Sequence, residues 1–328
     1  MRITILFGGT NKERLVSVAS AQALHRALPE ADLWFWHVAD TVHDVKSETL
    51  LSHKRPFEDA FEPGNRGVGF ETALDKAKAE DRVLVLGLHG GRAENGELQT
   101  MCEMRGIAFT GSGSASSHLA FDKTAAKRFA AIAGVRAPEG IALEDINAAF
   151  AEYGRLIAKP ARDGSSYGLI FVNAKQDLVA VRNAARTEEY LIEPYVSGVE
   201  ATCGVLERSD GTMLSLPPIE IIPGEGAFDY TAKYLLKSTQ EICPGRFSAE
   251  ITAALMDQAH RAHRALSCSG YSRTDFIVSA NGPIYLETNT LPGLTAASLY
   301  PKALKAQGIE FADFLRDQIL LAQKRSGK

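Results

Sequence analysis

Residues 83–88 form a continuous apolar run, and a glycine-rich segment at 89–96 follows it directly. A run without polar alternation is typical of a strand buried on both faces of a parallel sheet. Residues 3–7 repeat the arrangement, because this short apolar run ends in two glycines and the helical spacing of residues 16–28 follows. We therefore predict an open α/β unit in the first third of the chain, with glycine-rich turns at the sheet edge where such folds bind ligands.

Composition narrows the class of protein. The chain has 328 residues, of which 45% are hydrophobic, and this length suggests two or three domains. Against 36 Lys and Arg stand 40 Asp and Glu, so no global positive field attracts nucleic acid or an anionic membrane. No signal peptide and no apolar run of about 18 residues is recognisable, and we expect a cytoplasmic protein. Neither a disulfide framework nor a zinc site suits the scattered cysteines, Cys102, Cys203, Cys243 and Cys268.

The rest of the chain alternates between predicted elements and glycine-rich turns. The small, polar composition at 111–114 indicates a domain boundary. A long stretch at 223–248 has little periodicity, which is typical of a lid or binding loop. We predict helices over residues 120–133, 251–266 and 312–323, and strands over residues 156–159, 169–172 and 191–196.

An antiparallel hairpin is predicted within residues 272–289, with its turn at an Asn-Gly pair. Strand side chains alternate with period two, so the loop length decides which residues share a face. A two-residue turn would put Asp275 and Glu287 on opposite faces, whereas a three-residue loop over 280–282 with a left-handed Gly282 pairs them. We predict the three-residue loop.

Paired carboxylates on this hairpin indicate a metal site. Two carboxylates a few ångströms apart repel by roughly 4 kcal/mol at an effective dielectric near 20. Mg²⁺ relieves that repulsion, because it prefers hard oxygen ligands such as those of Asp275, Glu287 and Asn289, together with phosphates. The alternative is a solvated hairpin face on which Arg273 neutralises Asp275.

A glycine-rich turn with two serines follows Lys159. Backbone amides near Gly168 and the hydroxyls of Ser165 and Ser166 are suited to binding an anion, so the segment is predicted to cover phosphates. The same residues satisfy G-x-S-x-G, the nucleophile elbow of hydrolases, but that motif needs a helix after the serine and residues 169–172 predict a strand. A simple hairpin turn is the third alternative. No Walker or dinucleotide-binding motif occurs.

Glu13 has two interpretations. The spacing from Thr10 to Glu13 matches a capping box, and from local sequence we favour this helix-start role. Alternatively, Glu13 and Ser17, one helical turn apart, hold a small zwitterion with the carboxylate on its ammonium.

Three more polar residues have structural alternatives. His89 ends a strand beside glycines, which makes a binding site plausible, although such histidines are more often satisfied core or loop residues. Lys123 and Lys127, one turn apart, are predicted to lie on a solvated helix face.

These segments together resemble the D-alanine-D-alanine ligase family of the ATP-grasp fold, and the match runs in order through nearly the whole chain. Each motif is weak alone, but this many in register are highly specific. The resemblance rests on Gly8, Glu13, Ser17, His89, Glu94, Gln99, Thr110, Gly113, Asp122, Lys123, Lys159, Ser165, Ser166, Gly168, Glu193, Gly198, Glu200, Asp229, Lys233, Tyr234, Thr239, Cys243, Arg273, Asp275, Glu287, Asn289, Gly293, Ser298 and Leu299.

The resemblance implies a fold of mixed α/β and α+β class. An N-terminal open parallel α/β domain, residues 1–111, would bind the first substrate. Two ATP-grasp domains, residues 112–197 and 198–328, would enclose ATP between them. A homodimer in the cytoplasm is also implied.

The resemblance also assigns nucleotide and metal ligands. Two ions of Mg²⁺, or of Mn²⁺, would be held by Asp275, Glu287 and Asn289. Glu193 and the backbone of Tyr195 and Val196 would lie near adenine, with Glu200 on the ribose. The implied phosphate ligands are Lys123, Lys159, Ser165, Ser166, Lys233 and Arg273.

In such a ligase the carboxylate of one D-alanine takes the γ-phosphate, and the amine of a second D-alanine displaces it. Glu13 would bind the first ammonium, with Val16, Ser17 and His89 in the same pocket. Arg273 and the Gly293 amide would stabilise the oxyanion, and such a donor is typically worth about 10²- to 10³-fold in rate. Ser298 and Leu299 would receive the second carboxylate. Tyr234 on the lid, linked through Ser165 to Glu13, resembles the members that form dipeptides rather than depsipeptides.

Several positions depart from the family pattern: Leu15, Ala93, Asn95, Gly245 and Leu294. The hairpin is also one residue shorter than usual, and a slipped register would lose one metal ligand. Two alternatives to a D-alanine ligase therefore remain, a divergent amino-acid ligase and an ATP-binding protein without catalysis. A serine hydrolase acting through Ser166 is a remote third.

Overall fold

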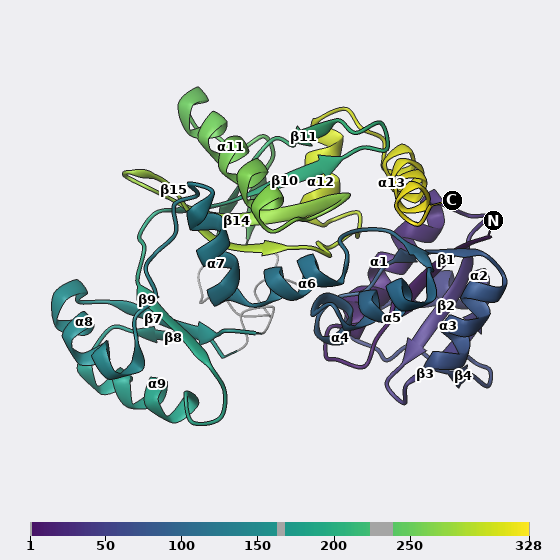
Figure 1. The fold of residues 1–328 in the computed structure, drawn as a ribbon, viewed down its shortest axis with the longest axis horizontal. Coiled ribbons are helices and arrows are strands. Elements are labelled where there is room, and N and C mark those ends of the chain that lie inside the picture. The colour runs from purple at the N-terminus through teal and green to yellow at the C-terminus, as the bar shows by residue number, and fades with distance from the viewer. Residues whose placement is uncertain (1, 163–167, 224–238, 328) are drawn as a thin grey trace.

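The computed structural model describes residues 2–162, 168–223 and 239–327. The structure has three sheets, which follow one another along the long axis of the molecule (Figure 1). The strand predicted over residues 169–172 is confirmed as β8 (Ile170–Val172), so the helix that a hydrolase nucleophile elbow would need does not follow residue 168.

The N-terminal sheet has the strand order β4-β3-β2-β1-β5-β6. The strands β1, β2, β5 and β6 pair in parallel, and β3 and β4 add an antiparallel edge. Helices cover both faces of the sheet (Figure 1). The elements are β1 (Arg2–Gly8), α1 (Arg14–Ala27), β2 (Asp32–His37), β3 (Thr41–Val45), α2 (Ser47–Ser52), β4 (Val68–Gly69), α3 (Phe70–Ala79), β5 (Arg82–Leu86), α4 (Gly91–Glu94), α5 (Glu97–Arg105) and β6 (Ala108–Phe109).

A small antiparallel sheet, β8-β7-β9, forms the lobe at the left of Figure 1. Its strands β7 (Leu156–Pro160) and β9 (Tyr190–Pro194) match the predicted strands. The helices α8 (Ile146–Tyr153) and α9 (Leu178–Ala184) cover it and close a separate small core.

The third sheet is antiparallel, with the order β13-β12-β10-β14-β15 and β11 paired to β10. Two of the predicted helices lie in this part of the chain, as α11 and α13. The elements are β10 (Val199–Glu207), β11 (Met213–Ser215), β12 (Ile219–Ile222), β13 (Gln240–Ile242), α11 (Ala249–Ala265), β14 (Tyr271–Ser279), β15 (Gly282–Asn289), α12 (Leu299–Ala306) and α13 (Phe311–Arg325).

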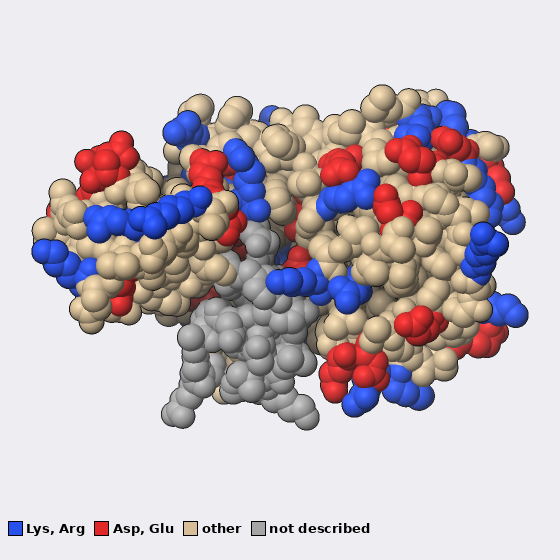
Figure 2. Space-filling model, turned by 90° about the horizontal axis from the view of Figure 1, so that it is seen from below, with Lys and Arg blue, Asp and Glu red and all other residues tan. Residues whose placement is uncertain are grey.

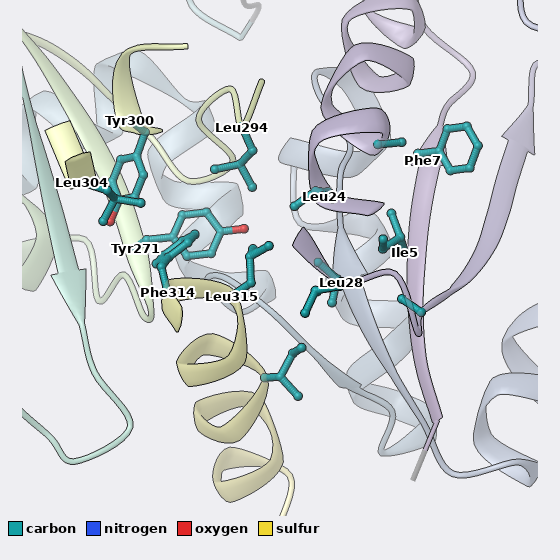
Figure 3. Close-up of a cluster of buried hydrophobic side chains, with 14 of the residues drawn as sticks. Ile5, Phe7, Leu24, Leu28, Tyr271, Leu294, Tyr300, Leu304, Phe314 and Leu315 are labelled. Carbon is teal, nitrogen blue, oxygen red and sulfur yellow. The ribbon is translucent and has the colours of Figure 1, made fainter. Parts of the chain in front are cut away.

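One buried cluster joins the N-terminal and C-terminal parts. Figure 3 shows Ile5, Leu24 and Leu28 of the N-terminal unit facing Tyr271 and Phe314 of the C-terminal unit. Burial of such side chains contributes about 1.5–3 kcal/mol each, so this shared core resists separation of the two parts. None of the described residues of the small lobe belongs to this cluster.

The helix predicted over residues 120–133 is two helices, α6 (Ser114–Phe121) and α7 (Lys123–Ile132). Asp122 separates them and caps α7 by accepting a hydrogen bond from the amide of Ala125 at 3.0 Å. The prediction that Lys123 and Lys127 lie on a solvated face is wrong, since α7 packs against α11 and β15 and both lysines are buried.

The hairpin has a different loop from the predicted one. Ser279 pairs with Gly282, so the turn consists of two residues, Ala280 and Asn281. A bulge between Asp275 and Phe276 then shifts the register by one residue and restores the pairing of Asp275 with Glu287. The three-residue loop was therefore wrong, whereas the pairing of the carboxylates and the positive φ of Gly282, 101°, are confirmed. The extra residue on β15 that makes the bulge is Leu286.

Surface and cysteines fit the composition. On the face seen in Figure 2, the coloured part of the surface intersperses basic and acidic side chains. None of the helices within the described ranges is long and apolar enough to cross a bilayer. All four cysteines are free thiols.

Candidate nucleotide and metal site

A cavity of about 610 Å³ lies between the small lobe and the C-terminal sheet. It brings together residues from α7, β7, β9, β10, β14 and β15, which are far apart in the sequence. Eight of the predicted site residues line it: Lys123, Lys159, Glu193, Tyr195, Val196, Glu200, Asp275 and Glu287.

Its polar end is a network of buried ion pairs. Glu193 is 1% exposed, and its two carboxylate oxygens bind Lys127 and Lys159, the latter at 3.0 Å. Lys123 lies 3.4 Å from the carboxylate of Glu287. The lysines and carboxylates of this end thus neutralise one another across the junction of the two domains.

Asp275 accepts hydrogen bonds from three side chains. Arg273 donates to both of its oxygens, at 2.9 and 2.8 Å. The hydroxyl of Thr202 donates at 2.6 Å, and the amide of Asn289 donates at 3.2 Å. The ion pair between Arg273 and Asp275 that the alternative interpretation predicted is therefore present. Its other part, a solvated hairpin face, is wrong at Asp275, which is buried.

These residues fit a magnesium ion. Asp275 faces Glu287 across the ladder and Asn289 faces Arg273, so two carboxylates and a carboxamide converge at one strand end. This donor set is the hard-oxygen type that Mg²⁺ prefers. Within the described ranges no cluster of three or more His, Cys, Asp or Glu side chains is arranged to hold a metal ion, so the candidate donor set is the two carboxylates and the carboxamide of this hairpin.

The other end of the cavity is apolar. Ile157 and Phe171 on the small lobe face the same space as Ile221 and Leu286 on the large sheet. Arg155 stacks on the ring of Tyr195 at 3.9 Å, which fixes the linker between the sheets. This slot was missed by sequence reasoning, because its members are single apolar residues on four separate strands.

Glu13 is not held in the capping box that its sequence favours. It stands at the N-cap of α1, no side chain caps this helix, and its amide donates to the side chain of Asn11 at 2.7 Å. The same side chain donates to the carbonyl of His89 at 2.7 Å and so ties the two glycine turns together. The carboxylate of Glu13 lies against Gly90, where a Cβ would overlap it.

Val16 and Ser17 are buried beneath this pocket. The hydroxyl of Ser17 accepts from the amide of Gly8 at 2.7 Å and donates to the carbonyl of Gly87 at 2.5 Å. Val16 is 2% exposed. Both residues therefore support the ends of β1 and β5 rather than line an open surface.

His89 bridges the N-terminal and C-terminal parts. Its Nδ1 lies 3.2 Å from the carbonyl of Leu291 and its Nε2 lies 2.9 Å from the hydroxyl of Ser20. Burial lowers its pKa to about 4, so the ring is neutral at pH 7. A neutral ring satisfies both contacts when Nδ1 donates and Nε2 accepts.

Glu94 shares this junction. Burial, followed by the charges of Glu13 and Glu287, raises its pKa to about 8, while Arg273 opposes the rise. The carboxyl group of Glu94 therefore holds its proton more tightly than a solvated glutamic acid does. Sequence reasoning gave it no role beyond its place in a motif.

Gly293 and Ser298 are adjacent at the start of α12. A Cβ on Gly293 would lie 2.7 Å from the hydroxyl of Ser298. That hydroxyl is 3.1 Å from the amide and 2.7 Å from the hydroxyl of Thr295. Leu299 begins the helix and packs on the shared core.

Four of the predicted site residues lie outside the described residues: Ser165, Ser166, Lys233 and Tyr234. Sequence analysis assigned no site role to three residues that interact with predicted site residues. Asn11 accepts from the amide of Glu13, Lys127 donates to Glu193, and Glu94 interacts electrostatically with Glu13 and Glu287. Lys127 had a detectable signal, namely its one-turn spacing from Lys123, but the pair was interpreted as solvated.

Comparison with known proteins gives the family of this arrangement. The chain is 33% identical to the D-alanine-D-alanine ligase of Halalkalibacterium halodurans, and the match covers 99% of the chain and 100% of that protein. Its structure is similar to the VanG D-Ala:D-Ser ligase of Enterococcus faecalis, with a TM-score of 0.78, 29% identity and coverage of 98% and 99%. It is also similar to a D-alanine-D-alanine ligase of Bacillus anthracis complexed with ATP, with a TM-score of 0.75, 28% identity and coverage of 100% and 98%.

Two family models match as well. Residues 2–112 match the D-ala D-ala ligase N-terminus and residues 145–320 match the D-ala D-ala ligase C-terminus. Together they span most of the chain in the expected order. The chain belongs to the D-alanine-D-alanine ligase family.

Proposed function

We propose that this chain joins two D-alanines into D-alanyl-D-alanine at the expense of ATP, as a step in peptidoglycan precursor synthesis. The observation that carries the proposal is the cavity between the two domains, with lysines and a carboxylate-bearing hairpin at one end and an apolar slot at the other. The near full-length match to D-alanine-D-alanine ligases supports it.

We assign the nucleotide to this cavity. The apolar slot suits a purine, with Glu193 and the backbone of Tyr195 and Val196 at its edge and Glu200 on the ribose. Lys123 and Lys159 would exchange their carboxylate partners for phosphates, which keeps each lysine neutralised in both states. Ser165, Ser166 and Lys233, outside the described residues, are proposed to complete the phosphate contacts.

Asp275, Glu287 and Asn289 would hold two Mg²⁺ ions. Bound there, the metal supplies charge neutralisation for the transferring phosphoryl group. The carboxylates are already neutralised by Arg273 and Lys123, so metal and nucleotide would replace internal ion pairs rather than relieve bare charge.

The reaction has two balanced steps. The carboxylate of the first D-alanine attacks the γ-phosphorus and expels ADP, which gives an acyl phosphate. The amine of the second D-alanine attacks the acyl carbon, loses a proton and expels phosphate. Arg273 and the Gly293 amide are proposed to bind the oxyanion of this second step.

Substrate contacts complete the proposal. Glu13 would pair with the first ammonium, and neutral His89 would hold the Leu291 segment beside it. Ser298 and the amide of Leu299, at the N-terminus of α12, would receive the second carboxylate. Val16 and Ser17 would support the pocket from below, and Tyr234, outside the described residues, would close it.

The test is ATP turnover with Mg²⁺ and, in turn, D-alanine, L-alanine, D-serine and D-lactate, with product masses measured in the same samples. ADP, phosphate and D-alanyl-D-alanine are expected with D-alanine alone. A clear preference for another amino acid would identify a divergent ligase, and ATP binding without turnover on any of them would contradict catalysis. Light scattering tests the homodimer that we also propose, and cell fractionation tests the proposed location in the cytoplasm.

A further inference from the structure

Lys127 contacts the carboxylate that is proposed to read the base of the nucleotide, but it does so from outside the cavity. Its ammonium donates to Oε1 of Glu193, and Lys159 pairs with Oε2 at 3.0 Å. Glu193 lines the cavity, whereas among the described residues Lys127 is not part of the lining. The carboxylate of Glu193 is therefore paired with Lys159, which lines the cavity, and with Lys127, which lies behind the cavity wall.

The position of Lys127 is fixed from three directions. It lies on α7, its partner lies on β9, and its ammonium is 3.5 Å from the carbonyl of Tyr285 on β15. The residue is only 6% exposed, and α7 packs against β15 and α11. The ammonium thus sits where the small lobe meets the C-terminal sheet, and it cannot follow a ligand into the cavity without breaking buried contacts.

We expect the two lysines to respond differently to nucleotide binding, because only Lys159 lines the cavity. Lys159 lines the cavity and is free to move to a phosphate oxygen, which removes it from Glu193. Burial, and then the charge of Lys159, lower the pKa of Lys127 to about 7, so the departure of Lys159 favours the charged form of Lys127 beside this 1% exposed carboxylate. A carboxylate that is paired with a lysine presents hydrogen-bond acceptors only, and the lysine fixes the direction in which its oxygens point.

We propose that Lys127 is a positioning residue that holds the carboxylate of Glu193 in place as a hydrogen-bond acceptor, and that it thereby sets the preference for a 6-aminopurine over a 6-oxopurine nucleotide. The inference rests on the proposed nucleotide site. An ionised Glu193 accepts a hydrogen bond from the amino group of adenine and repels the oxygen of hypoxanthine. Without Lys127 the carboxyl group is no longer held in that orientation, and the preference between the two bases weakens.

The test compares ATP with inosine triphosphate, which differs at the 6-position of the purine, in the full chain. Lys127→Met is expected to raise the KM for ATP by about tenfold or more, the usual effect of losing a charge-assisted hydrogen bond, with a smaller change in kcat. The ratio of kcat/KM for ATP to that for inosine triphosphate should fall by a similar factor. Lys127→Arg should retain much of the ratio, because it keeps the charge.

Controls separate positioning from general damage. Arg128 is exposed on the same helix, so Arg128→Met removes one positive charge there and should leave the ratio unchanged. In a Glu193→Gln background, adding Lys127→Met should have no further effect on the ratio, as expected for two residues that act as a unit. A Lys127→Met variant with an unchanged ratio, whether or not its kcat or thermal stability falls, would overturn the inference.

The failure of this inference and the failure of the proposed function are distinguishable. If the wild type does not turn over ATP with D-alanine, the proposed ligase activity is wrong. Calorimetric binding of the two magnesium nucleotides to the wild type and to Lys127→Met still decides the role of Lys127. Equal discrimination by both proteins would refute it.

Discussion

Replacing Asp275 by asparagine is expected to destabilise the ligand-free protein strongly. The carboxylate lies 2.8 Å from Arg273, and Coulomb's law at an effective dielectric near 20 gives about 6 kcal/mol of attraction at that separation, before desolvation. For comparison, any two carboxylates at a separation of about 4 Å repel by roughly 4 kcal/mol on the same scale, and at Glu287 the ammonium of Lys123, 3.4 Å away, offsets such repulsion. Attraction therefore exceeds repulsion, and Asp275→Asn removes the carboxylate that accepts two hydrogen bonds from the partly buried guanidinium of Arg273. Breaking such a pair costs about 3–5 kcal/mol.

Urea denaturation followed by circular dichroism, without metal and with a chelator, measures this cost. Asp257→Asn is the matched control, because Asp257 pairs with Arg261 at the same 2.8 Å but both side chains are half-exposed. That control should change the free energy of unfolding by about 0.5 kcal/mol or less. If Asp275→Asn is no worse than the control, or stabilises the protein, repulsion between the hairpin carboxylates dominates and the reasoning is refuted.

Two further predictions concern the junction of the domains. Gly293→Ala should lower kcat/KM for the second D-alanine by about tenfold or more. The reason is that its Cβ would lie 2.7 Å from the hydroxyl of Ser298 and displace it. An unchanged kcat/KM in initial-rate assays would contradict a second-substrate site formed by Gly293 and Ser298. Folding lowers the pKa of His89 from 6.5 to about 4, so the unfolded chain binds this proton more tightly than the folded chain. The contribution of the neutral ring to stability is therefore complete above pH 6.5 and is lost as the pH falls toward 4. The difference in unfolding free energy between wild type and His89→Asn should shrink by up to about 3 kcal/mol over that window, and a constant difference in denaturation curves would exclude the neutral ring.

Local pattern was sufficient for most strands and helices. The apolar runs that predict β1 and β5 and the periodicity of α1, α11 and α13 depend on residues that are near neighbours in the chain. The pairing of Asp275 with Glu287 was also predicted, but for the wrong reason. A bulge at Leu286 compensates for the short turn, and no turn residue signals a bulge six residues away.

The errors at the site arose from tertiary contacts. Lys123 and Lys127 have the spacing of a solvated face, and only the packing of α7 on β15 and α11 buries them. Thr10 and Glu13 satisfy a capping box, yet Asn11 occupies the amide of Glu13 because its side chain also reaches the His89 turn. Sequence spacing carries no information about an element that is brought in from elsewhere in the fold.

The central claim is that an amino-acid carboxylate takes the γ-phosphate of ATP before a peptide bond forms. The direct measurement supplies D-alanine labelled with a heavy oxygen isotope in its carboxylate, together with ATP and Mg²⁺, and records the masses of the released phosphate and of the dipeptide. We predict D-alanyl-D-alanine, with one labelled oxygen transferred to each phosphate. Unlabelled phosphate, or ATP hydrolysis without dipeptide, would contradict the account.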